Sequence, residues 1–93
     1  MNVKKKIIKI MSLCLEINPP EVAEIGKKKT AVFFHWYPHC NCLEIYGYFR
    51  RWKIQTDKDF DFAVYTDREP EKLDEIIRFL EGILEGEENA IHT

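Results

Sequence analysis

Apolar residues near the start of the chain recur at the spacing of one helix face. They are Val3, Ile7, Ile10, Met11, Cys14 and Ile17. Intervals of three and four residues place side chains on one side of an α-helix, so the pattern predicts a helix over residues 3–17. Ile8 and Leu15 widen the apolar stripe, and we therefore expect this helix to be buried on more than one side. The helix should end at Asn18-Pro19-Pro20, because a residue that precedes proline is biased away from the helical region.

The middle of the chain has the alternation and the residue types of β-strands. Residues 30–37 are rich in β-branched and aromatic side chains, which favour strands. Pro38-His39-Cys40-Asn41 has turn chemistry, and a second strand pattern follows over residues 42–49. We expect these two strands to pair as a hairpin. After a polar loop, residues 60–65 alternate between apolar and polar positions and predict a third strand.

The clearest periodic pattern lies near the end of the chain and predicts a helix over residues 68–85. Its apolar stripe consists of Leu73, Ile76, Ile77, Leu80, Ile83 and Leu84. Asp67 is the expected N-cap, with Thr66 as the alternative. The acidic residues that suit the positive end of the helix dipole are Glu69 and Glu71. Gly86 should end the helix, and residues 87–93 should form a frayed tail.

The order of these elements is α-β-β-β-α, and a length of 93 residues allows a single domain over residues 1–93. Two helices with apolar stripes need a shared apolar surface, and a three-stranded antiparallel meander supplies one on a single face. We therefore predict an α+β fold in which both helices pack on one face of the sheet. The opposite face is then left without a helix.

The uncovered face of the predicted sheet carries all four tyrosines. Side chains alternate along a strand, so we assign the more apolar side of each strand to the core. The residues on the other face are then Phe33, His35, Tyr37, Tyr46, Tyr48, Arg50 and Tyr65. The strand over residues 30–37 is apolar on both sides, so the sequence leaves its core side open.

An exposed aromatic patch of this kind indicates a contact surface, because Tyr and Arg concentrate binding energy at interfaces. The alternative is cross-strand pairing that only stabilises the sheet. We expect a non-enzymatic protein-interaction module, and self-association as a homodimer is the commonest outcome for a small protein. A competing hypothesis is single-stranded nucleic-acid binding, with bases stacking on Phe33, Tyr46 and Tyr48 beside Arg50 and Arg51. The net charge of −2 counts against nucleic acid as a partner.

Charge is unevenly distributed along the chain. Residues 1–53 carry ten Lys and Arg against four Glu, which gives +6. Residues 54–93 carry four Lys and Arg against twelve Asp and Glu, which gives −8. One interpretation is that the two parts complement each other within the molecule and otherwise form solvated faces. The other is a basic patch that binds an anionic partner.

Four residues of the types that bind zinc lie on and beside the predicted hairpin turn. They are His35, His39, Cys40 and Cys42. Structural zinc usually takes two separated pairs of ligands, whereas these residues crowd one turn, so we expect no metal. His35 and Cys42 flank the turn, where they can face each other, which leaves a metal-binding hairpin as a further alternative. Cys-His catalysis needs a base and a third orienting group around a thiolate, and adjacent residues such as His39 and Cys40 are poorly placed for it.

The chain has no glycine-rich phosphate loop and no run of about 18 apolar residues. Three cysteines are an odd number, which is typical of free thiols in a reducing cytosol. Lys9 interrupts the apolar run that a signal peptide would need. We therefore expect a cytoplasmic protein that has no cofactor and no membrane partner.

A hairpin pattern over residues 30–52 resembles small uncharacterised proteins that are encoded by phages and prophages of Gram-positive bacteria. The residues that carry the resemblance are Phe33, Phe34, His39, Asn41, Leu43, Ile45 and Trp52. The matching segment is about a quarter of the chain and contains no catalytic signature. The resemblance implies a bacterial or phage cytoplasmic context and an accessory, non-enzymatic role.

Overall fold

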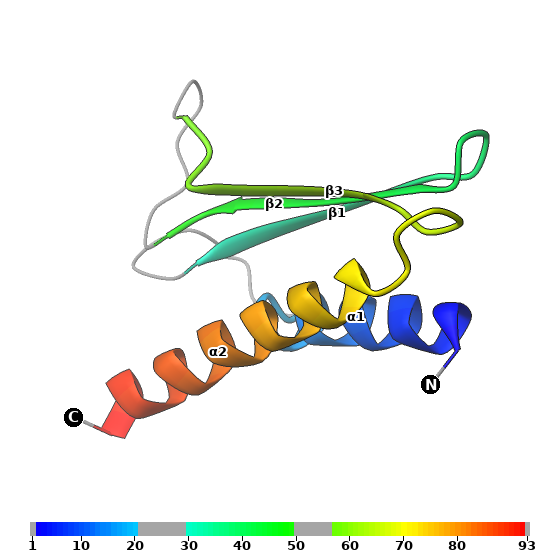
Figure 1. Ribbon diagram of the computed structural model, residues 1–93. Helices are drawn as coiled ribbons and strands as arrows, with labels where there is room; N and C mark the ends of the chain where they lie inside the picture. Colours follow the sequence, from blue (N-terminus) through cyan, green and yellow to red (C-terminus); the bar gives the residue numbers. More distant parts are fainter. Residues whose placement is uncertain (1, 21–29, 50–56, 93) are drawn as a thin grey trace.

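The structure is a computed structural model that describes residues 2–20, 30–49 and 57–92, with side chains described as far as residue 86. Its elements follow the predicted order (Figure 1). They are α1 (Val3–Ile17), β1 (Ala31–Tyr37), β2 (Cys42–Tyr48), β3 (Phe60–Tyr65) and α2 (Lys72–His92). The α+β prediction is confirmed, and the strands agree with their predicted ranges to within one residue at each end.

The three strands form an antiparallel meander in the order β1-β2-β3. The register places Ile45 opposite Phe34 on one side and opposite Phe62 on the other. The hairpin between β1 and β2 turns at Asn41, whose φ of 52° lies in the left-handed region that Asn tolerates. The backbone N–H of Thr66 donates to the Asn41 carbonyl over 2.8 Å, so the same turn also holds the end of β3.

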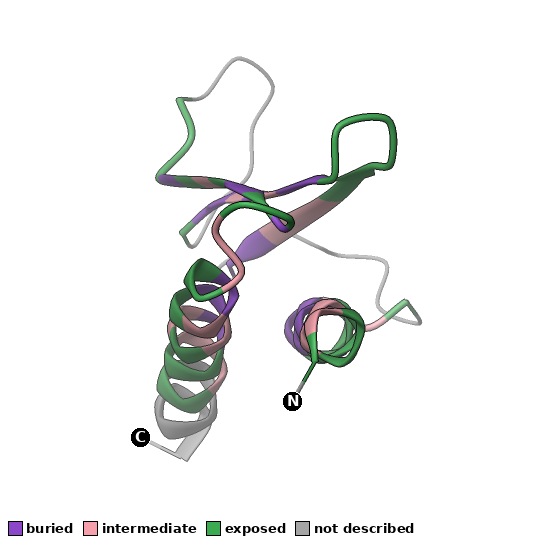
Figure 2. Ribbon diagram, turned by 45° about the vertical axis from the view of Figure 1, so that its right-hand side comes forward, coloured by how far each residue is buried: buried purple, intermediate pink, exposed green. Residues whose placement is uncertain are grey.

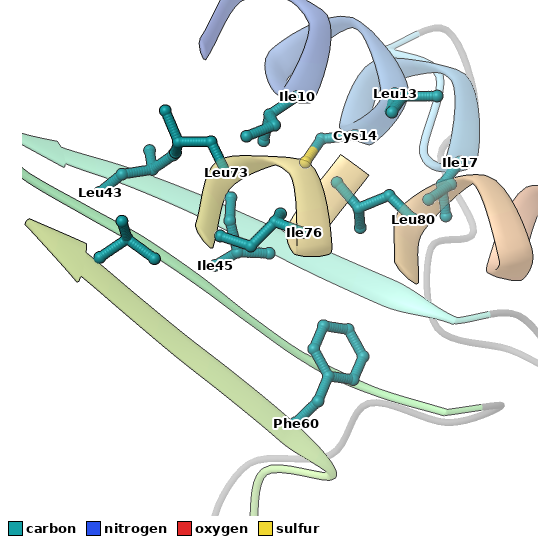
Figure 3. Close-up of a cluster of buried hydrophobic side chains, with 11 residues drawn as sticks. Ile10, Leu13, Cys14, Ile17, Leu43, Ile45, Phe60, Leu73, Ile76 and Leu80 are labelled. Carbon is teal, nitrogen blue, oxygen red and sulfur yellow. The ribbon is translucent and has the colours of Figure 1, made fainter. Parts of the chain in front are cut away.

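Both helices lie on the same face of the sheet, with α1 against β1 and α2 against β3 (Figure 1). The helices also pack on each other, and the core is the space that they share with the sheet (Figure 3). The buried side chains of this core are Ile10, Leu13, Cys14, Ile17, Leu43, Ile45, Phe60, Val64, Leu73, Ile76 and Leu80. Val32 and Phe34 pack against it, which settles the side of β1 that faces the core.

Helix α1 is buried on one side only, so the expectation of wider burial was wrong. The side chains of Ile10 and Ile17 are fully buried, whereas Ile8 is 46% exposed and Leu15 is 50% exposed. Figure 2 shows the buried side of α1 turned toward α2 and the exposed residues on its outer side. The physical reason is that, among the described elements, α1 contacts only β1 and α2. No further element of the described chain covers its other side.

Helix α2 differs from its prediction at both ends, because it begins at Lys72 and continues to His92. Before it, the N–H groups of Arg68 and Glu69 both donate to the Tyr65 carbonyl and form a turn. Pro70 disfavours helical geometry at the preceding residue, which accounts for the later start. Asp67 and Thr66 therefore do not cap the helix, and the acidic residues of its first turn are Asp74 and Glu75.

Gly86 does not end α2, and residues 87–92 are helical rather than a frayed tail. Glycine ends a helix when the chain needs a left-handed residue at that point, and otherwise it only lowers helix propensity by about 1 kcal/mol. An added Cβ at Gly86 would meet nothing within 4 Å, so no packing constraint acts there.

Among the described side chains, one ion pair joins the oppositely charged helices. Lys6 Nζ on α1 lies 3.0 Å from Asp74 Oδ2 on α2. The other ion pairs of the described residues connect positions three apart in the sequence, Lys58 with Asp61 and Lys72 with Glu69. The expected charge complementarity between residues 1–53 and residues 54–93 is thus present at one described contact. None of the described helices is long and apolar enough to span a bilayer.

Candidate interaction surface

The face of the sheet opposite the helices, called the open face below, carries the predicted aromatic residues. The register brings Phe33, His35 and Tyr37 of β1 beside even-numbered residues of β2. The described strand residues of this face are Ala31, Phe33, His35, Tyr37, Cys42, Glu44, Tyr46, Tyr48, Asp61, Ala63 and Tyr65. Arg50 and Arg51, the remaining predicted contributors, lie outside the described residues.

The centre of the open face is a stack around Tyr46. The ring of Phe33, directly across the pair of strands, lies parallel to it with centroids 5.0 Å apart. The imidazole of His35 stacks on the same ring at 5.3 Å, and its Nε2 shares a 3.1 Å hydrogen bond with the Tyr46 hydroxyl. Aromatic pairs across strands stabilise a sheet, so this arrangement holds the rings in fixed positions.

The aromatic row continues toward the hairpin turn. Tyr37 stacks on His35 at 6.1 Å and meets His39 edge-on at 6.2 Å. The Tyr37 hydroxyl donates to Glu44 Oε1 over 3.3 Å. Desolvation and the nearby Glu44 carboxylate raise the pKa of Tyr37 above its ordinary value, so the phenol keeps its proton and remains a donor.

The accessible part of the open face is smaller than the sequence predicts. Tyr48 is only 8% exposed and packs edge-on against Phe33 with centroids 6.0 Å apart. It therefore supports the aromatic row but offers little surface to a partner. Phe33 and Tyr46 are half-buried, and the exposed aromatic residues are His35, Tyr37 and Tyr65.

Two cations that the sequence pattern does not predict lie over tyrosine rings of this face. Lys58 Nζ is 4.2 Å from the ring centroid of Tyr46, and the Arg68 guanidinium is 5.2 Å from that of Tyr65. Partial dehydration lowers the pKa of Lys58, but Asp61 at 3.5 Å outweighs it, so the pKa lies above the ordinary value. The contact of Lys58 with Tyr46 follows from the strand register, which places Asp61, the ion-pair partner of Lys58, opposite Tyr46. The sequence alone does not give this register.

The His and Cys residues of the hairpin are not gathered into a metal site. The register pairs Cys42 with Tyr37 and His35 with Glu44, so the expectation that His35 and Cys42 face each other was wrong. Across the described residues, no three His, Cys, Asp or Glu side chains are close enough to hold a metal ion. The hairpin turn separates the four candidates, because His39 and Cys40 lie in the turn itself.

The thiols of the described chain differ in exposure. Cys40 is exposed, and its Sγ donates weakly to the Tyr37 carbonyl over 3.9 Å. Burial raises the pKa of Cys42, and it raises the pKa of the core residue Cys14 to about 12. A reactive thiol requires the opposite shift, so neither buried cysteine has the character of a nucleophile.

Comparisons with protein-family models, with curated proteins and with solved structures give no match to this chain. The resemblance of residues 30–52 to phage and prophage proteins therefore stays a prediction.

Proposed function

We propose that this chain is a non-enzymatic protein-interaction module that self-associates through the open face of its sheet. The observation that carries the proposal is that both helices pack on one face, while exposed aromatic residues occupy the other. His35, Tyr37 and Tyr65 each combine an apolar ring with a polar group, the property that enriches such residues at interfaces.

The charges around the aromatic row suit contact between two copies of the chain. Glu44 and Asp61 are acidic, whereas Lys58 and Arg68 are basic, so the face carries both signs. A two-fold interface is formed by the same patch on both subunits, and a patch with both signs can complement itself. The rings are already stacked before binding, so binding does not have to order them and loses less conformational entropy.

Single-stranded nucleic acid fits this face less well. A base would need a free ring face to stack upon, yet Tyr46 already stacks on Phe33 and His35 and has the Lys58 ammonium over it. The metal-binding hairpin has no supporting cluster among the described residues. The proposed setting is the cytoplasm of a bacterium, in keeping with the free thiols and with the resemblance to phage proteins.

Sedimentation of the purified chain over a range of concentrations tests the proposal. We expect a concentration-dependent dimer, and we expect the double variant Tyr37→Ser with Tyr65→Ser to sediment as a monomer. Both tyrosines are exposed, so the change removes contact surface without opening a cavity in the core. The salt dependence should be weak, because aromatic contacts rather than net charge supply the affinity.

The matched control is the double variant Ile8→Ser with Leu15→Ser on the outer side of α1, where both residues are similarly exposed. It should dimerise like the unaltered chain. A monomer at every concentration, or a dimer that survives the loss of both tyrosines, would refute self-association through the open face.

A further inference from the structure

Among the strands that the structure describes, none pairs with the backbone groups on the outer edge of β1. In an antiparallel strand, the N–H and C=O of one residue point to the same side, and successive residues alternate. The backbone groups of Val32, Phe34 and Trp36 point away from β2, because the side chain of Asn18 reaches Val32 from that side. β1 is the first strand of the sheet, so this side is a sheet edge.

Asn18 protects only the beginning of this edge. Its Oδ1 accepts from the Val32 N–H over 2.7 Å, and its Nδ2 donates to the Thr30 carbonyl over 2.9 Å. The side-chain amide thus stands where a peptide group of a neighbouring strand would stand. Farther along the edge, no turn, cap or loop hydrogen bond within the described chain uses the backbone of Phe34 or Trp36.

An apolar groove of about 520 Å³ lies beside this unprotected stretch. The groove lies between the N-terminal half of α1 and the end of the sheet that carries the β1–β2 hairpin turn. Figure 1 shows this end of the sheet above α1. The apolar residues of the lining are Val3, Ile7, Ile8, Met11, Phe34 and Trp36. Met11 is 42% exposed and Trp36 is 39% exposed, so the groove leaves a substantial apolar surface open to solvent.

The width of the sheet explains why the groove exists. Packed helices lie about 8–10 Å apart, and three strands at about 4.8 Å spacing extend over a similar distance. The outer side of α1, under the edge strand, is therefore left without cover. A fourth strand beside β1 would lie above that side and close the groove.

The outer edge of β3 is less suited to the addition of a strand. The Tyr65 carbonyl already accepts from the N–H groups of Arg68 and Glu69. The groove beside β3 is smaller, about 260 Å³, and includes the charged residues Asp61, Lys72 and Glu75 in its lining. Charged residues at an edge discourage the addition of another strand. The β1 edge is thus the one suited to an incoming segment.

We propose that the β1 edge binds an extended, acidic segment of a partner protein, which adds to the sheet as a fourth strand. Main-chain hydrogen bonds to Phe34 and Trp36 supply affinity, and alternate apolar side chains enter the groove. Among the described residues that line the groove, Lys4 is the charged one, so a carboxylate in the segment complements it. A lipid surface would cover the apolar residues but would not pair with the directional backbone groups.

The probe is a short synthetic peptide in which valine alternates with threonine between flanking glutamates. Trp36 reports binding through its fluorescence once the second tryptophan has been replaced by Trp52→Phe. We expect a saturable blue shift as the peptide covers the indole. Met11→Lys, at an exposed position inside the groove, should abolish this shift, and Lys4→Glu should weaken binding several-fold.

A second peptide separates strand addition from simple apolar contact. In a strand added antiparallel to β1, like the other pairings of this sheet, the valines that enter the groove also direct their N–H groups toward β1, so N-methylation of the valines removes those hydrogen bonds. Binding should weaken by roughly ten- to a hundredfold, the effect expected from the loss of two or three hydrogen bonds. Equal binding of both peptides, or no saturable shift, would overturn the proposal.

Two controls distinguish peptide binding at the β1 edge from association through the open face and from binding to a membrane. The double variant Tyr37→Ser with Tyr65→Ser should bind the peptide unchanged, whatever its own oligomeric state, so the two proposals can fail separately. A Trp36 shift with anionic phospholipid vesicles and none with the peptide would overturn strand addition in favour of membrane docking.

The charge of the partner is tested separately. A lysine-flanked peptide that binds as tightly as the glutamate-flanked one would remove the basis for an acidic partner.

Discussion

Gly47 lies at a position of the sheet that has no room for a side chain. It lies on β2 between its two neighbouring strands, and an added Cβ would collide with the Ala31 carbonyl oxygen and with the ring of Phe60. Glycine usually weakens a strand, because it has no side chain to pack. Here the missing side chain allows Phe60 to pack across β2 toward the core.

We expect Gly47→Ala to destabilise the protein by about 1–3 kcal/mol, because the Ala31 backbone and the Phe60 ring must both move away from the added methyl group. Urea unfolding followed by circular dichroism measures the change in the free energy of unfolding. The matched control is Gly82→Ala in α2, where a Cβ meets nothing within 4 Å. That change should stabilise the helix by about 0.5–1 kcal/mol. A neutral Gly47→Ala would show that the close approach to Phe60 does not limit packing.

At the scale of elements, Asn18 connects α1 to β1. Its backbone N–H donates to the Cys14 carbonyl over 2.9 Å and closes the helix. Its side chain then satisfies the Thr30 carbonyl just before β1 and the Val32 N–H within it. The sequence marks Asn18 only as the end of a helix, because its strand partners lie more than ten residues farther along the chain.

We expect Asn18→Ala to destabilise the protein by about 1–3 kcal/mol, because it leaves a partly buried strand N–H without its acceptor. Amide hydrogen exchange should show faster exchange at Val32 than the loss of global stability explains. The comparison is Asn2→Ala, which removes the bond from the Lys5 N–H to the N-cap of α1 and should cost about 1 kcal/mol. In that variant, Val32 should exchange no faster than global unfolding allows. Unchanged exchange at Val32 in Asn18→Ala would contradict the connecting role.

On the scale of the whole molecule, the two helices and the sheet share one core. Ile76 of α2 is fully buried beside residues from α1 and β2 (Figure 3). Phe79 of α2 also packs on the rings of Phe60 and Phe62, with centroids 4.8 and 5.0 Å away. Neither layer can bury its apolar side without the other, so the fold should unfold as one unit.

We expect Ile76→Ala to cost about 2–5 kcal/mol, a large fraction of the stability of a domain this small. Far-ultraviolet circular dichroism and tryptophan fluorescence should report the same urea midpoint in the variant. Leu15→Ala, at a half-exposed position of α1, should change stability by less than about 1 kcal/mol. Separate midpoints for the two signals would indicate that helices and sheet unfold independently.

The sequence by itself determined the order of the elements, the meander and the side of β2 and β3 that faces the core. These features follow from local periodicity, because alternation and helical spacing act within a few residues. The open face was predicted for the same reason, including Tyr37 and Tyr65, which the structure leaves exposed.

Only the tertiary structure decided which apolar residues stay exposed. Ile8 and Leu15 look like core residues in the sequence, and Tyr48 looks like a surface residue, yet each has the opposite environment. Their burial depends on the lateral position of each helix under a narrow sheet, and on which side chain packs against Phe33. Such positions are set by contacts between segments distant in the chain, and no local pattern encodes them.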